Sequence, residues 1–168
     1  MFRGCQQRSL RGRFAAAVEP VEVICHGDFA PHNCVLDGGR VVGVFDFDHA
    51  HPGTRLWDVA YAAYRWVPLT APGNADGLGT TGEQAARLRV FCDRYGLDGA
   101  GRAGLVDAVV ARLHTLVGFM RAQAAAGNAA FAGHLAAGHH IQYLNDAGYV
   151  REQRLAFTPS AAGGPRRS

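Results

Sequence analysis

Two aspartates and one asparagine near the start of the chain are the residues whose types and spacing best suggest chemistry. Asp28 and Asn33 lie five residues apart in the stretch HGDFAPHN that begins at His26, and Asp46 follows thirteen residues after Asn33. A carboxylate can accept the proton of an attacking hydroxyl, and an amide oxygen and a second carboxylate are hard ligands for Mg²⁺. This ordered set is what phosphoryl transfer from a nucleotide requires.

Short apolar strands must position these side chains. Residues 21–25 predict a strand that leads into the loop with Asp28, and residues 34–36 and 40–45 predict a hairpin that ends next to Asp46. The apolar run in the second hairpin strand favours a buried position. An alternative is that the three polar residues only cap turns and end strands. Their order around a hairpin favours the phosphoryl-transfer interpretation.

In the rest of the chain, apolar residues recur at the spacing of a helix. Four helices are predicted, over residues 55–67, 81–95, 103–126 and 129–147. A breaker at residues 51–53 precedes the first, and Thr81 with Gln84 fits a capping box for the second. The aromatic residues of the first helix, Trp57, Tyr61 and Tyr64, are assigned to the core.

Composition bounds the class of protein. A chain of 168 residues with 48% apolar residues predicts one globular domain. The net charge is +3 without a basic run, so binding of nucleic acid is not expected. The four cysteines contain no CxxC pair, no apolar span reaches the length of a membrane helix, and no secretory signal is visible. These features predict a cytoplasmic protein without membrane contact.

The sequence gives little support for a zinc site or for a dinucleotide or P-loop nucleotide motif. The pairs His49/His51 and His139/His140 lack zinc-ligand spacing, so a zinc site is not expected, although His49 could lie at the mouth of a cleft. No glycine-rich dinucleotide or P-loop motif occurs. Acidic residues over 68–150 are not clustered, which argues mildly against a polycationic substrate.

A family resemblance rests on three stretches, HGDFAPHN, VVGVFDFD and RLWDVAYAAYRW. They resemble the aminoglycoside phosphotransferase and choline kinase superfamily, which is similar to protein kinases in fold. The resemblance is closest to bacterial phosphotransferases, some of them linked to trifolitoxin immunity, and is strongest over residues 21–67. It implies an α+β, mostly α fold, namely the C-terminal catalytic lobe: a small β-hairpin region followed by about four helices. It also implies transfer of the γ-phosphoryl group of ATP, with Mg²⁺, to a small hydroxyl-bearing substrate.

The resemblance also implies roles for single residues. Asp28 would be the catalytic base, and Asn33 and Asp46 would be the metal ligands. His26 would open the catalytic loop as a structural histidine. Asp58 would hold that loop through hydrogen bonds to its backbone, and a carboxylate inside a buried helix needs such partners because desolvation is costly.

One departure from the kinase pattern lies directly after the metal ligand. Asp48 stands where the pattern has glycine. Asp48 and His49 are therefore candidate cleft residues that could face the metal, the substrate or solvent.

A second departure concerns the nucleotide. Kinase-like enzymes cover ATP with an N-terminal lobe that supplies a lysine, but only 25 residues precede His26 and the chain has no lysine. We therefore expect an irregular segment over residues 1–20, the catalytic lobe over 21–157, a disordered tail over 158–168, and neither an N-terminal ATP lobe nor a clamp lysine. Three possibilities remain: a lobe with little activity alone, one half of a split enzyme, and a non-enzymatic binding or immunity protein. Self-association, or a partner that supplies the missing lobe, is a further expectation.

Overall fold

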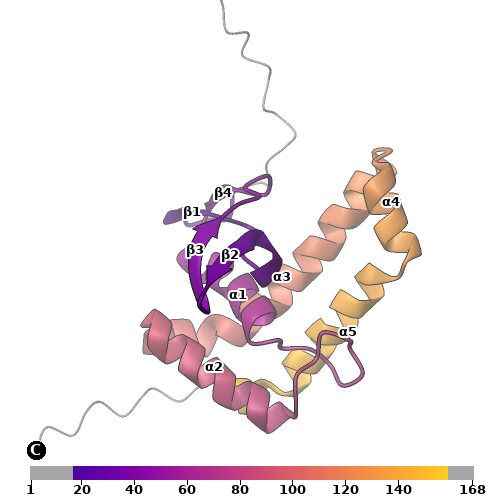
Figure 1. Cartoon of the computed structure of the whole chain (residues 1–168). Coiled ribbons are helices and arrows are strands. Elements are labelled where there is room, and N and C mark those ends of the chain that lie inside the picture. Colours follow the sequence, from indigo (N-terminus) through magenta and orange to yellow (C-terminus); the bar gives the residue numbers. More distant parts are fainter. Residues whose placement is uncertain (1–16, 159–168) are drawn as a thin grey trace, which may run out of the picture.

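The computed structural model describes residues 17–158. The predictions for residues 1–16 and 159–168 lie outside this range, and residues 17–20 form neither helix nor strand. Six α-helices and four short strands make up the described part of the chain (Figure 1). The prediction of an α+β, mostly α fold is confirmed.

The strands form two separate antiparallel pairs. β1 (Val23–Cys25) pairs with β4 (His51–Gly53), and β2 (Cys34–Asp37) pairs with β3 (Arg40–Val44) around a two-glycine turn. The sequence treated residues 51–53 as a breaker, but they form the partner of β1. Gly53 permits this pairing because a Cβ atom there would lie 2.8 Å from the Cys25 Sγ.

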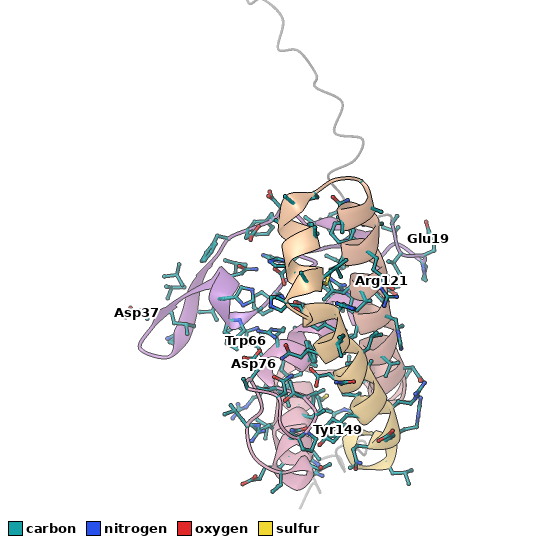
Figure 2. All side chains as sticks on the ribbon, turned by 90° about the vertical axis from the view of Figure 1, so that its right-hand side faces the viewer. Glu19, Asp37, Trp66, Asp76, Arg121 and Tyr149 are labelled. Atoms are coloured by element: carbon teal, nitrogen blue, oxygen red, sulfur yellow. The ribbon has the colours of Figure 1, made fainter. Side chains whose placement is uncertain are left out.

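The β2–β3 hairpin projects from the helices, with Asp37 near its tip (Figure 2). The predicted burial of its second strand is wrong, because Val42 is 61% exposed and Phe45 is 48% exposed. An apolar run predicts burial only where a second layer covers the strand, and no such layer covers this hairpin within residues 17–158.

The helices follow one another after β4. Their bounds are α1 (Arg55–Trp66), α2 (Thr81–Tyr95), α3 (Gly99–Ala125), α4 (Ala129–Ala136), α5 (His139–Glu152) and α6 (Arg154–Phe157). The first three agree closely with the predicted ranges. The predicted helix over 129–147 is instead two helices, because Gly138 adopts a φ of +80° and ends the first of them.

The start of α2 also differs in detail from the prediction. Thr80 rather than Thr81 is the N-cap, and it forms the capping box with Glu83. Gln84, the predicted partner, is buried and donates instead to the carbonyl oxygen of Thr70 at 3.1 Å. Gly96 is the C-cap of α2 and adopts a left-handed φ of +78°.

Helix α3 is the centre of the fold. It packs against α1, α4 and α5 (Figure 1), and Leu105, Val109 and Leu113 on it are almost fully buried. By length and composition alone, α3 could cross a membrane. Within the described residues, its buried apolar side chains face the neighbouring helices.

A buried carboxylate ties α5 to α1 and to the loop that follows α1. Asp146 accepts hydrogen bonds from the Tyr64 hydroxyl at 2.8 Å, the Ala71 N–H at 2.7 Å and the Asn74 amide at 2.8 Å. Burial raises the pKa of Asp146, and these three donors oppose that shift. The network fixes the relative position of two helices that line the cavity described below.

Candidate active site

The loop with Asp28 is held at its start by Asp58 in the first turn of α1. One carboxylate oxygen of Asp58 accepts from the His26 N–H and the other from the Gly27 N–H, both at 3.0 Å. Thr54 caps this helix by accepting from the Trp57 N–H at 3.0 Å, so Asp58 sits on an anchored turn. The predicted contacts of Asp58 with the loop backbone are therefore present.

Burial of Cys25, directly before this loop, has an electrostatic consequence. Desolvation, and then the negative charge of Asp58, raise the pKa of the Cys25 thiol from 9.0 to about 11. Cys25 is therefore a protonated packing residue at neutral pH.

His26 joins the loop to the end of β3. Its Nδ1 accepts from the Asp28 N–H at 3.2 Å, so the ring proton is assigned to Nε2, which donates to the Phe45 carbonyl oxygen at 3.0 Å. The bond at Nδ1 requires that this nitrogen carries no proton. His26 thereby couples the backbone of Asp28 to the residue directly before Asp46.

Asn33 fixes the Asp28 side chain. The amide nitrogen of Asn33 donates to both the main-chain carbonyl oxygen and the carboxylate Oδ2 of Asp28, each at 2.9 Å. These two bonds leave the amide oxygen of Asn33 free for another partner. His32 lies nearby, with its Nε2 3.9 Å from the same carboxylate oxygen.

The strand register brings Asn33 and Asp46 to the same end of the hairpin. Cys34 pairs with Val44, and one step further the Phe45 N–H donates to the Asn33 carbonyl oxygen at 3.1 Å. Asp46 comes next, is exposed, and adopts a left-handed φ of +63°. Its exposed carboxylate forms no ion pair within residues 17–158.

Two residues of the site, Asp46 and Gly27, adopt a left-handed backbone conformation. A left-handed conformation costs a non-glycine residue about 1–2 kcal/mol, and such strain is concentrated at functional sites. Asp46 carries this strain. Gly27, at φ +79°, escapes it, and no other residue would fit there because a Cβ atom would lie 2.3 Å from the His49 carbonyl oxygen.

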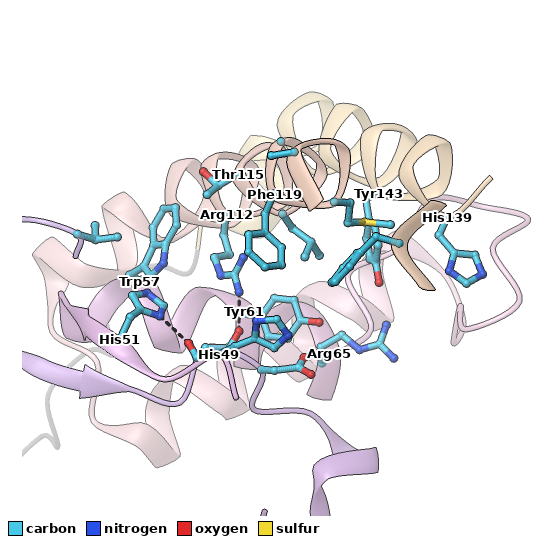
Figure 3. A pocket seen from close by; sticks show the side chains of 18 of the residues that line it. His49, His51, Trp57, Tyr61, Arg65, Arg112, Thr115, Phe119, His139 and Tyr143 are labelled. Carbon is cyan, nitrogen blue, oxygen red and sulfur yellow. Dashed lines mark hydrogen bonds between the residues drawn. The ribbon is translucent and has the colours of Figure 1, made fainter. Parts of the chain in front are cut away.

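Asp28 borders a cavity of about 790 Å³. The cavity lies between the loop with Asp28, α1 and the helices α3 to α5, and Figure 3 shows side chains from both sides pointing into it. His49, a candidate from the sequence, lines it. Asp48 is exposed and does not. The volume suits a small molecule.

Three cavity residues were missed by sequence reasoning. Trp57, Tyr61 and Tyr64 were assigned to the core, and the assignment is confirmed for Tyr61 and Tyr64, which are 5% and 1% exposed. Trp57 is only partly buried, and both it and Tyr61 also line the cavity. Arg112 on α3 also lines it and was not singled out. A usable signal was the spacing of Trp57, Tyr61 and Arg65, which places them on one face of α1.

Tyr61 adds to the electrostatics around the carboxylate. Burial raises the pKa of Tyr61, and the negative charge of Asp28 raises it further. The hydroxyl is therefore a neutral hydrogen-bond donor beside Asp28 at physiological pH. Arg112 opposes the same negative charge from α3, over the Tyr61 ring at 4.8 Å.

The family model for the phosphotransferase enzyme family matches residues 5–91. Three curated relatives share 33–36% identity with parts of the chain. A protein of Deinococcus radiodurans described as uncharacterized is 36% identical over 101 residues, which is 60% of this chain and 28% of the relative.

The other two relatives carry functional names. The trifolitoxin immunity protein of Rhizobium leguminosarum bv. trifolii is 33% identical over 94 residues, 55% of this chain and 36% of that protein. The homoserine kinase of Methylobacillus glycogenes is 35% identical over 72 residues, 43% of this chain and 20% of the enzyme. The matches thus span between 20% and 36% of the relatives' lengths. No solved structure matches the chain.

Proposed function

This chain belongs to the phosphotransferase enzyme family, and from that membership and the loop geometry we propose that it transfers the γ-phosphoryl group of ATP to a hydroxyl of a small molecule. One observation carries the proposal. The Asp28 carboxylate, held by Asn33, borders a cavity of about 790 Å³, and the register of the hairpin places Asn33 and Asp46 together at its open end.

Asp28 is the base in this proposal. A hydroxyl bound in the cavity donates a hydrogen bond to the carboxylate, which accepts its proton as the oxygen attacks the phosphoryl group. Asn33 holds the carboxylate by its amide nitrogen, and His26 and Asp58 hold the backbone on either side of Gly27. Such positioning is most of what a protein contributes to phosphoryl transfer.

Asn33 and Asp46 fit Mg²⁺ as a cofactor. The free amide oxygen of Asn33 and the exposed carboxylate of Asp46 are hard oxygen ligands, and Mg²⁺ in nucleotide sites uses one or two carboxylates together with phosphate oxygens and water. No cluster of three His, Cys, Asp or Glu side chains among residues 17–158 could hold a metal ion. When bound, Mg²⁺ would neutralise charge on the transferred phosphoryl group.

Two features bear on where the chain acts and what assists it. Cys25, Cys34 and Cys92 are free thiols, which supports a reducing, cytoplasmic compartment. Because these 168 residues contain no lysine, a lysine contact to the nucleotide phosphates would have to come from outside them. An arginine, with its planar fork, is not equivalent at such a position.

The test is the release of ADP from Mg²⁺-ATP, measured with a panel of small alcohols as acceptors. Asp28→Asn should lower turnover by about a hundredfold or more, the size of a general-base contribution. Asp46→Asn should weaken Mg²⁺-dependent binding of ATP. Asp37→Asn, near the hairpin tip, is the matched control and should change neither.

Two outcomes would contradict the proposal: turnover by Asp28→Asn equal to that of the wild type, or no turnover by the wild type with any acceptor. In the second case, adding a lysine-bearing partner chain and restoring turnover would identify a split enzyme.

A second candidate function has one observation in its favour, the similarity to a trifolitoxin immunity protein. The chain would then act by binding rather than by catalysis. A protective phenotype that survives both Asp28→Ala and Asn33→Ala would favour this candidate. Loss of protection in both variants would favour the enzyme.

A further inference from the structure

The charges on the cavity wall are uneven. Among residues 17–158, Asp28 is the only acidic residue that lines the cavity, whereas two arginines, Arg65 and Arg112, line it together with several histidines. Arg65 is paired with Asp76, which lies outside the cavity, at 3.3 Å. Arg112 is therefore the arginine of this wall that has no carboxylate partner within ion-pair distance among residues 17–158.

Arg112 is the unusual member of this wall. Its side chain is 92% buried, yet no carboxylate of residues 17–158 lies within ion-pair distance of it. Its guanidinium donates to the Gly27 carbonyl oxygen and lies 4.8 Å from the centre of the Tyr61 ring and 5.7 Å from that of Trp57 (Figure 3). Its buried Nε has no partner in the described part of the chain.

A buried cation without an anion is costly, because desolvation of the charge is not repaid by an ion pair. The aromatic faces, one carbonyl oxygen and the more distant negative charges of Asp28 and Asp58 offset only part of this cost. An oxyanion on a bound molecule would supply the missing ion-pair partner of Arg112, since guanidinium and carboxylate or phosphate groups match in geometry.

The remainder of the cavity wall is apolar and rich in rings. Phe119 contacts His49 and Phe131 edge to face, with ring centres 5.5 and 5.4 Å apart. Phe131 in turn contacts His134, with ring centres 5.8 Å apart. Tyr61 and Tyr143 add rings from α1 and α5, as Figure 3 shows. Such walls bind flat aromatic groups by offset and edge-to-face contacts.

Aromatic walls also bind quaternary ammonium groups, but two observations argue against a cationic ligand here. The Arg112 guanidinium already lies over the Tyr61 and Trp57 rings, and the second arginine, Arg65, lies on the same wall. A cation bound against these rings would therefore lie beside the like charge of Arg112.

We propose that the phosphoryl acceptor is an aromatic alcohol that carries an oxyanion such as a carboxylate, and this inference rests on the proposed function. Arg112 binds the oxyanion while the hydroxyl of the same molecule reaches Asp28. Arg112 then has two contacts: the Gly27 carbonyl oxygen, which positions the loop, and the oxyanion of the acceptor.

The experiment is isothermal titration calorimetry of the full chain, without nucleotide, against four matched probes. They are para-(hydroxymethyl)benzoate, the neutral para-benzenedimethanol, the cationic para-(aminomethyl)benzyl alcohol, and the cyclohexane analogue of the benzoate. The benzoate should bind about tenfold tighter than the neutral diol, a typical gain for one charge-assisted hydrogen bond. The cation should bind more weakly than the diol, and the cyclohexane analogue more weakly than the benzoate.

Arg112→Met separates binding of the anion from a structural role. It should bring the affinity ratio of benzoate to diol close to one, because only the anion loses its partner. A purely structural role would lower the affinity for both probes alike and leave the ratio intact. Arg121→Met, on an exposed position of the same helix, is the control and should leave the ratio unchanged. The wild-type comparison among probes holds even where Arg112→Met fails to fold.

Several results would overturn the inference: no binding of the benzoate, equal affinity for the anionic and neutral probes, tighter binding of the cation, or an unchanged ratio in Arg112→Met. If the cyclohexane analogue binds as tightly as the benzoate, the inference that the acceptor is aromatic is overturned.

Phosphorylation assays with ATP distinguish this inference from the proposed function. If the cationic probe is phosphorylated and the benzoate is not, the proposed function stands and the inference fails. If the benzoate binds selectively but neither it nor any other acceptor receives a phosphoryl group, the inference about the pocket stands and the proposed function fails.

Discussion

At the scale of single residues, the site is built from groups whose hydrogen bonds leave specific atoms free. Asn33 uses its amide nitrogen on Asp28, which leaves its oxygen available. His26 must be neutral to accept from one backbone group and donate to another. Both carboxylate oxygens of Asp58 accept hydrogen bonds from the backbone of the loop, so Asp58 has a structural role.

The importance of Asp58 can be tested by Asp58→Asn. The amide can accept only one of the two backbone N–H groups and presents its own N–H to the other, so we expect a loss of about 2 kcal/mol or more in the free energy of unfolding. Denaturant unfolding measures it. The same variant should lower the pKa of the Cys25 thiol, because the negative charge of Asp58 contributes to raising it to about 11.

Asp107→Asn is the matched control for this prediction. Asp107 forms an exposed ion pair with Arg154, and exposed pairs contribute little to stability. An equal loss of stability in the two variants would contradict a special role for Asp58.

At the scale of elements, two short strand pairs and the start of α1 create the loop geometry. Antiparallel pairing of β2 with β3 places Asn33 opposite Phe45, next to Asp46. Pairing of β1 with β4 brings the His49 carbonyl oxygen against Gly27. The loop conformation therefore depends on a close backbone approach that only glycine allows.

Gly27→Ala tests this dependence. Both the left-handed φ and the contact with the His49 carbonyl oxygen oppose the methyl group, so the loss of unfolding free energy should exceed the cost of φ alone by about 1–3 kcal/mol, the usual penalty of overpacking. Turnover of ATP should fall as well, since Asp28 is the next residue.

Gly39→Ala supplies the comparison for φ alone. Gly39 has a φ of +77°, nearly that of Gly27, but an added Cβ atom would contact nothing within 4 Å. Its substitution should cost about 1–2 kcal/mol and leave turnover unchanged. Equal stability losses at both positions would show that the close approach to residue 49 is unimportant.

At the scale of the whole molecule, α3 is the wall shared by the core and the cavity. It packs against α1, α4 and α5, and from it Arg112 reaches the carbonyl oxygen of Gly27, 85 residues earlier in the chain. Asp146 on α5 bonds Tyr64 on α1, 82 residues away. These long-range contacts set the distance between the cavity walls.

Tyr64→Phe tests the link between α1 and α5. The variant keeps the ring but removes one of three donors to a buried carboxylate, so we expect a loss of about 1.5–3 kcal/mol in the free energy of unfolding, the range for hydrogen bonds to charged groups. Tyr95→Phe, at a residue that is 44% exposed, should change stability little. Equal effects of the two substitutions would contradict a structural role of the Asp146 network.

The sequence by itself determined much of this protein. The period of the apolar residues predicted α1, α2 and α3 closely, because burial of one helix face is a local property of the pattern. The order of Asn33 and Asp46 around a hairpin predicted that they would lie at the same end of it, because antiparallel pairing follows from two strands and a short turn.

Only the tertiary structure decided the rest. The burial of residues 41–45, the split at Gly138 and the pairing of residues 51–53 depend on which layers lie beside them. The same holds for Trp57, Tyr61 and Arg112, whose side chains share one cavity because α1 and α3 pack together. A residue pattern specifies which face of a helix is apolar, but the partner opposite that face decides whether it becomes core or binding site.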